Sequence, residues 1–71
     1  MTNTTTYTAE YKITADTDEP TRNSLAAIDY PQTLGDVRDT CRNLGVSATL
    51  RDEPGGFVRG YVNSIGDHSL A

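Results

Sequence analysis

Residues 33–45 read TLGDVRDTCRNLG and predict one helix over Thr33–Leu44. Thr33 is typical of an N-cap, and Asp36 three residues later completes a pair that resembles a capping box. The apolar residues recur at spacings of 3, 4 and 3 and therefore share one helix face: Leu34, Val37, Cys41 and Leu44. Gly45 then suits the positive φ that ends many helices. A helix of under four turns is marginal alone in water, so we expect a sheet beneath its apolar face.

On the N-terminal side, apolar and polar residues alternate from residue 7 to residue 15, which is typical of a half-buried strand. The apolar side carries every second residue: Tyr7, Ala9, Tyr11, Ile13 and Ala15. The polar side carries the residues between them: Thr8, Glu10, Lys12 and Thr14. The following stretch, residues 16–23, is polar and contains Pro20, and it therefore predicts a loop.

Residues 24–30 fit two structures. Ala26, Ile28 and Tyr30 alternate like a short strand that Pro31 would end. Ser24 could equally cap a single helical turn over residues 25–29. We favour the strand, because it would pair back on the first strand across the loop at residues 16–23.

The stretch from Val46 to Val62 predicts a hairpin with its turn at residues 52–56. A five-residue loop pairs Leu50 with Val58 and Val46 with Val62. In this register the outer face carries four residues: Arg51, Phe57, Arg59 and Tyr61. A two-residue turn at residues 55–56 would instead place both aromatic residues beside Leu50, because a slip of one residue reverses every side chain. We favour the first register, since it buries more aliphatic surface.

These elements predict an α+β fold, with a small antiparallel sheet of three to four strands packed by one helix. Their order is strand, short strand, helix, strand, strand. A chain of 71 residues suffices for one domain. We therefore expect a single small domain over residues 1–71. Flexible ends are expected at residues 1–6 and 63–71, where the sequence has no periodic pattern.

Charge and cysteine content narrow the class of protein. Six basic against ten acidic residues give a net charge of −4. No stretch approaches the roughly 20 apolar residues of a membrane span, and the Thr-rich start lacks the pattern of a signal peptide. One cysteine cannot form an internal disulfide, which fits a reducing compartment. The sequence therefore predicts a cytoplasmic protein that does not bind membranes.

Residues for catalysis are few. Cys41 lies on the apolar side of the predicted helix, where a free cysteine commonly acts as a small buried hydrophobic residue. His68 lies close to the C-terminus, where we expect it to be solvated. Asp36 and Asp39 stand one helical turn apart, but acidic residues in a first turn also complement the helix dipole. The sequence therefore predicts no catalytic residues and a protein that is not an enzyme.

Metal and cofactor sites are not expected either. Zinc usually needs four Cys or His ligands, and this chain has one residue of each type. Asp16, Asp18 and Glu19 resemble the start of a calcium loop, but the glycine at position six and the glutamate at position twelve are missing. Pro54-Gly55-Gly56 is glycine-rich, but no Lys-Ser/Thr follows, so it predicts a hairpin turn rather than a phosphate site.

The outer hairpin face is the first candidate binding surface, because Arg and Tyr are enriched in interface hot spots. It predicts contacts of Arg51, Phe57, Arg59 and Tyr61 with a protein partner. The same residues could stack and neutralise single-stranded nucleic acid, although a net charge of −4 opposes this alternative. A structural homo-oligomer that joins exposed sheet edges is the third hypothesis.

A second candidate surface is acidic and could steer the protein toward a basic partner. It comprises six residues: Asp16, Asp18, Glu19, Asp29, Asp36 and Asp39. In size and acidity the chain is similar to small phage proteins that block a host enzyme or a defence complex. This likeness predicts an accessory protein or inhibitor from a phage or another mobile element.

Overall fold

The computed structural model describes residues 5–70 of the chain. Within this range two helices and five strands follow in order: β1 Thr6–Tyr11, α1 Glu19–Ala26, β2 Gln32–Thr33, α2 Leu34–Leu44, β3 Ala48–Arg51, β4 Val58–Val62 and β5 His68–Leu70. The predicted α+β class is confirmed, but the sheet has five strands rather than three to four, and a second helix is present. Neither described helix is long and apolar enough to span a bilayer.

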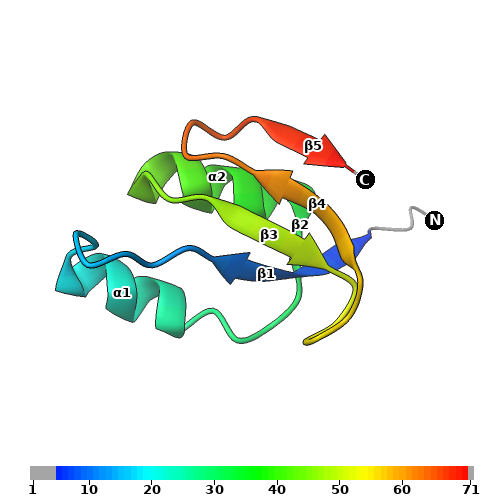
Figure 1. The fold of residues 1–71 in the computed structure, drawn as a ribbon, viewed down its shortest axis with the longest axis horizontal. Coiled ribbons are helices and arrows are strands. Elements are labelled where there is room, and N and C mark those ends of the chain that lie inside the picture. The colour runs from blue at the N-terminus through cyan, green and yellow to red at the C-terminus, as the bar shows by residue number, and fades with distance from the viewer. Residues whose placement is uncertain (1–4, 71) are drawn as a thin grey trace.

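The strands form one antiparallel sheet in the order β2-β1-β3-β4-β5. Figure 1 shows α2 behind the sheet, across β3 and β4, and α1 beside the C-terminal end of β1. One face of the sheet is thus covered by α2, and the other faces solvent. We call the solvent side the open face.

The core lies between α2 and the sheet. Five buried residues form it: Val37, Cys41, Ala48, Leu50 and Val62. Four half-buried residues pack against them: Tyr7, Ala9, Tyr11 and Leu34. The alternation predicted for the first strand is therefore confirmed from residue 7 to residue 11, where β1 ends, and so is the apolar face of the predicted helix.

Both ends of α2 follow the predicted pattern. Thr33 is the N-cap, and its Oγ1 accepts a hydrogen bond from the Asp36 backbone nitrogen at 3.2 Å. Gly45 ends the helix with φ 67°, a left-handed conformation that glycine adopts without steric cost. Local capping chemistry thus sets where this helix begins and where it ends.

The strand predicted at residues 24–30 is wrong, and so is the second half of the loop predicted at residues 16–23. Helix α1 occupies residues 19–26 instead. Asp18 precedes it in an extended conformation, and Pro20 falls in its first turn, where a missing N–H costs nothing. Leu25 is its buried residue, and Arg22 Nη2 donates to the Thr14 carbonyl at 3.1 Å. The short strand that pairs back on β1 is β2, immediately before α2.

Neither predicted hairpin register is correct. Ala48 pairs with Val62 and Leu50 with Gly60, so the favoured register is displaced by two residues along β4. An even displacement keeps each side chain on its face, and Ala48, Leu50 and Val62 are buried as expected. The register then shifts between Leu50 and Arg51, which leaves Arg59 as an extra residue in β4.

The C-terminal stretch forms a turn and a strand. Asn63 Oδ1 accepts hydrogen bonds from the backbone nitrogens of Ile65 and Asp67 at 3.1 and 3.0 Å, and Gly66 adopts φ 91°. Strand β5 then returns along β4. Residues 1–4 and 71, which belong to the ends predicted to be flexible, lie outside the described residues.

Candidate interaction surface

The open face is built from the residues of each strand that point away from α2. Cross-strand pairing aligns Glu10 of β1, Thr49 of β3, Tyr61 of β4 and Ser69 of β5 in one row across the sheet. A second row begins with the pair Thr8 and Arg51. The polar side of the first strand and the outer side of the hairpin therefore meet on one surface.

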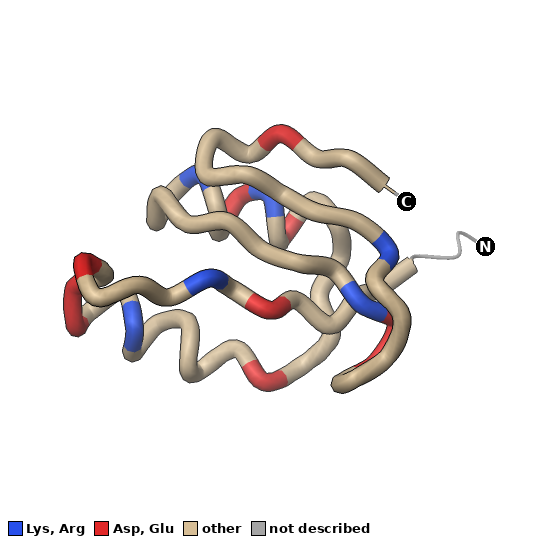
Figure 2. Tube along the Cα trace, viewed as in Figure 1, with Lys and Arg blue, Asp and Glu red and all other residues tan. Residues whose placement is uncertain are grey.

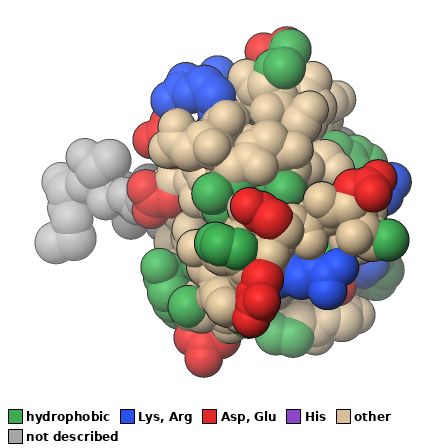
Figure 3. All heavy atoms as spheres, turned by 90° about the vertical axis from the view of Figure 1, so that its left-hand side faces the viewer, with side chains coloured by type: hydrophobic (Ala, Val, Ile, Leu, Met, Phe, Trp, Pro, Cys, Tyr) green, Lys and Arg blue, Asp and Glu red, His purple; other side chains and the backbone are tan. Residues whose placement is uncertain are grey.

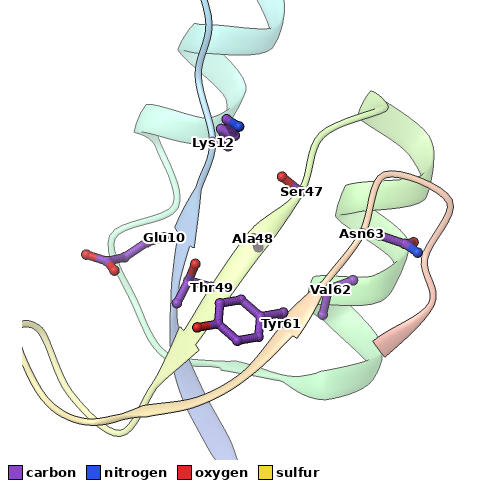
Figure 4. Close-up of a pocket in the computed structure, with 8 residues that line it drawn as sticks. All are labelled: Glu10, Lys12, Ser47, Ala48, Thr49, Tyr61, Val62 and Asn63. Carbon is purple, nitrogen blue, oxygen red and sulfur yellow. The ribbon is translucent and has the colours of Figure 1, made fainter. Parts of the chain in front are cut away.

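Tyr61 lies at the centre of this surface beside a shallow depression of about 380 Å³. In Figure 4 its ring extends from β4 across β3 toward Thr49, while Lys12 and Glu10 border the depression on the β1 side and Asn63 on the β4 side. Tyr61 is 56% exposed. The lining of the depression thus combines the aromatic ring of Tyr61 with hydroxyl, amide and charged groups.

Arg51 is held in place from two sides. Its Nε donates to Glu10 Oε1, and its Nη1 donates to the Gly56 carbonyl at 2.7 Å. The Arg51 side chain is half-buried, whereas that of Glu10 is exposed. The guanidinium therefore joins β1 to the hairpin loop and has little rotational freedom left.

The charge of Arg59 is neutralised by a different carboxylate, that of Asp52. Its Nε and Nη2 donate to the two carboxylate oxygens of Asp52 at 2.7 and 2.5 Å. This bidentate hydrogen bond holds the pKa of Asp52 below its ordinary value, and the Asp52 carboxylate raises the pKa of Arg59. Both arginines predicted as contacts thus carry a carboxylate partner, and the four charges sum to zero.

The structure brings only part of the predicted hairpin surface together. Arg51 and Tyr61 share the open face. The register shift places Val58 rather than Arg59 opposite Arg51, so strict alternation is interrupted before Phe57 is reached. Phe57 lies in the hairpin loop beside Asp52 and is 81% exposed. It forms a separate apolar projection at the end of the hairpin.

The six acidic residues predicted as a second surface do not form one patch. The six residues lie in three places, at the turn into α1, after α1 and on α2, and Figure 2 shows further acidic positions elsewhere along the chain. Asp39 also accepts a hydrogen bond from Arg42 at 2.6 Å. On the face shown in Figure 3, acidic, basic and apolar side chains are interspersed rather than gathered by type. The acidity of the chain is therefore distributed over the molecule.

The reactive side chains have ordinary structural positions. Cys41 is fully buried, and burial raises the pKa of its thiol from 9.0 to about 11, so the nucleophilic thiolate is disfavoured. His68 is exposed on β5. Among residues 5–70, no three His, Cys, Asp or Glu side chains are grouped to hold a metal ion.

Sequence reasoning missed several residues that shape the surface. Glu10 and Lys12 were placed only on the polar side of the first strand, because nothing in the sequence said that β1 lies beside β3. Gln32, which belongs to the interior and not to the surface, was also missed. It is buried, and its Oε1 accepts a hydrogen bond from the Tyr11 hydroxyl at 2.6 Å, which helps to hold β2 against β1.

Comparisons of this chain with protein-family models, with curated proteins and with solved structures found no match.

Proposed function

We propose that the protein is a small non-enzymatic module that binds a protein partner through the open face of its sheet. The observation that carries the proposal is Tyr61, which is half-exposed at the centre of that face beside a depression of about 380 Å³. Tyrosine supplies a large contact area at low entropic cost and is enriched among interface hot spots.

The fixed position of Arg51 supports this proposal. Ordering a long side chain on binding costs about 0.5–1.5 kcal/mol, and the hydrogen bonds of Arg51 to Glu10 and Gly56 meet that cost before a partner arrives. A half-exposed tyrosine on the same face as an arginine that is already held in place is a suitable centre for an interface. Phe57, at the end of the hairpin, is the natural peripheral contact.

A protein partner is favoured over nucleic acid by the charges of this surface. Arg51 and Arg59 are each paired with a carboxylate. Lys12 is the cation of the open face that has no ion-pair partner among the described residues. Binding to nucleic acid depends on several cations that neutralise phosphates, and a single lysine supplies little of that free energy.

The size and acidity of the chain extend the proposal to the kind of partner. A net charge of −4 on 71 residues is similar to that of small phage proteins that block a host enzyme or a defence complex. We therefore propose a bacterial enzyme or defence complex as the partner to be sought first.

The test compares Tyr61→Ala with Tyr30→Ala, because the two tyrosines are 56% and 58% exposed, but Tyr61 lies on β4 in the open face and Tyr30 in the connection between α1 and β2. Each variant and the wild type would be tagged, used to capture partners from nuclease-treated bacterial lysate, and then titrated against the purified partner. We expect the wild type and Tyr30→Ala to bind equally. Tyr61→Ala should lose about 2 kcal/mol, or about 30-fold in Kd.

Two results would overturn the proposal. If Tyr61→Ala binds the captured protein as tightly as Tyr30→Ala does, the open face is not the interface. If capture disappears on nuclease treatment and affinity for a single-stranded oligonucleotide falls steeply with salt, the protein binds nucleic acid.

A further inference from the structure

We propose that the outer edge of β5, residues His68–Leu70, pairs with the same edge of a second copy of this chain. The two sheets would then continue into one another across a two-fold axis at Ser69. This inference is independent of the proposed function, since it concerns the edge of the sheet and not its open face.

The register of β4 and β5 shows which peptide groups face outward. The Asn63 backbone nitrogen donates to the Asp67 carbonyl at 2.9 Å, and Tyr61 pairs with Ser69 two residues farther along each strand. In an antiparallel pair, residues that exchange two hydrogen bonds alternate with residues that exchange none. The peptide groups of Ser69 therefore face β4, and those of His68 and Leu70 face away from the sheet.

Most of the features that protect an edge strand are not present at β5. Proteins block such edges with very short strands, Lys, Pro, inward charges or bulges, and of these β5 has only its short length of three residues. Asp67 is the one charged residue in the stretch 63–70, and the pairing of β5 with β4 runs without a register shift. By contrast, β2 at the opposite edge has two residues, is preceded by Pro31 and runs directly into α2.

A second copy fits this edge because the pairing is self-complementary. With the two-fold axis at Ser69, His68 of each chain lies opposite Leu70 of the other. The outward N–H and C=O groups of these two residues then pair with those of the second chain. This arrangement forms about four backbone hydrogen bonds. Leu70 is 50% exposed and would become covered.

Charge also permits this arrangement. Each chain carries a net charge of −4, so association must keep acidic residues apart. In the antiparallel pairing the two Asp67 residues lie at opposite ends of the joined strands, about 14 Å apart from the strand rise and spacing. This distance exceeds the Debye length of about 8 Å at physiological ionic strength. The remaining residues of the joined edge are uncharged or His68.

The area involved is small, so the dimer would be weak. A pair of three-residue strands buries well under the roughly 1,200 Å² of a stable interface. We therefore expect a monomer at about 10 µM and a growing dimer fraction toward about 1 mM. Sedimentation equilibrium of the full chain over this range measures the mass directly.

The variant Leu70→Lys places a charge on the edge, and Ile65→Lys is its matched control, because Ile65 is an exposed apolar residue in the turn before β5. We expect Ile65→Lys to dimerise like the wild type and Leu70→Lys to dimerise at least about tenfold more weakly. Amide exchange provides a second readout. The His68 amide should become protected as concentration rises, while the Ser69 amide, already bonded to β4, should not change.

Preserved protection of Ser69 in Leu70→Lys would show that β5 is still in place, which separates loss of dimerisation from loss of the strand. A wild type that stays monomeric at about 1 mM would overturn the proposal. Equal association of Leu70→Lys and the wild type would overturn it as well. A His68 amide that stays unprotected in the dimer would also overturn the proposal. The same holds for a His68 amide that becomes protected only when a different protein is added.

Discussion

Arg38 Nε donates a hydrogen bond to the Gly66 carbonyl oxygen at 2.7 Å and so joins the middle of α2 to the turn that precedes β5. The turn packs closely here: Gly66 is buried, and a Cβ on this residue would lie 3.4 Å from both the Arg38 carbonyl oxygen and Arg42 Cβ. Strand β5 therefore depends on the helix as well as on its pairing with β4.

Replacement of Arg38 by alanine should destabilise the protein by about 1.5–3 kcal/mol, because the Gly66 carbonyl loses a charged donor in a half-buried site. Urea unfolding measures the change, and exchange of the Ser69 amide, which is bonded to β4, should accelerate. Arg42→Ala is the control, since its ion pair with Asp39 is exposed and contributes under about 0.5 kcal/mol. Equal losses in the two variants would contradict the role of Arg38.

The approach of β5 to β4 requires glycine at position 60. A Cβ on Gly60 would lie 2.7 Å from the Ser69 carbonyl oxygen and 2.9 Å from Leu70 Cδ2, so β5 would have to move. We expect Gly60→Ala to cost about 1–3 kcal/mol in the free energy of unfolding, which thermal unfolding followed by circular dichroism would measure.

Gly35 provides the matched comparison for this substitution. It lies in the first turn of α2, and the nearest atom to a Cβ there is Thr33 Oγ1 at 4.0 Å. Gly35→Ala should therefore stabilise the protein by about 0.5–1 kcal/mol through helix propensity. A Gly60→Ala protein at least as stable as the wild type would show that the close approach at Gly60 has no energetic weight.

Local signals in the sequence predicted α2 correctly, and β1 as far as Tyr11, whereas the strand predicted to continue over residues 12–15 is wrong. Thr33, Asp36 and Gly45 act through neighbours in the chain, so their roles are visible without a fold. Helix α1 was missed because Pro20 was interpreted as a loop residue, although Asp18 followed by Pro20 is also typical of a helix start. Its single buried residue, Leu25, leaves no apolar stripe that periodicity could detect.

Features that depend on distant residues were not predictable in the same way. The two-residue displacement of the hairpin and the extra residue Arg59 are visible only in the pairing of β3 with β4. The alternation of side chains along a strand was enough to place Tyr61 and Arg51 on the outer face correctly. It failed for Phe57, which lies beyond the bulge at Arg59. The link between Glu10 and Arg51 joins residues 41 positions apart, and only the strand order reveals it.

The thiol of Cys41 should make the protein less stable in alkali. Its pKa is raised from 9.0 to about 11 in the folded state, because burial disfavours the thiolate. Above about pH 9 the unfolded chain loses this proton while the folded chain keeps it, so the free energy of unfolding falls as pH rises. The full effect, above about pH 11, is about 3 kcal/mol.

Urea unfolding of the wild type and of Cys41→Ala at about pH 8 and about pH 10.5 tests this prediction. Cys41→Ala should be less stable at the lower pH, because it leaves a small cavity, but should lose less stability between the two. Tyr11, whose pKa is raised mainly by burial, titrates in both proteins, but the Cys41 thiolate adds to its shift only in the wild type. Identical pH dependence in the two proteins would mean that the thiol is not protected in the fold.

The pair between Asp52 and Arg59 should be visible as a titration at the end of the hairpin. Arg59 holds the pKa of the Asp52 carboxyl below its ordinary value of 3.8, so the contribution of the pair is present above that value and disappears as pH falls through the lowered pKa. Arg59→Gln should return the Asp52 pKa toward 3.8, as carbon-detected NMR titration would show. Global stability should change little, because both side chains are exposed.

Arg42→Gln is the control for this titration, since Arg42 pairs with Asp39 on α2 and should leave the pKa of Asp52 unchanged. Added salt should also raise the pKa of Asp52 in the wild type, because exposed charges are screened. An Asp52 pKa that is the same in the wild type and in Arg59→Gln would mean that the arginine is free in solution. It would then be available to a partner as a cation, and the charge argument against nucleic acid would lose one of its two neutralised arginines.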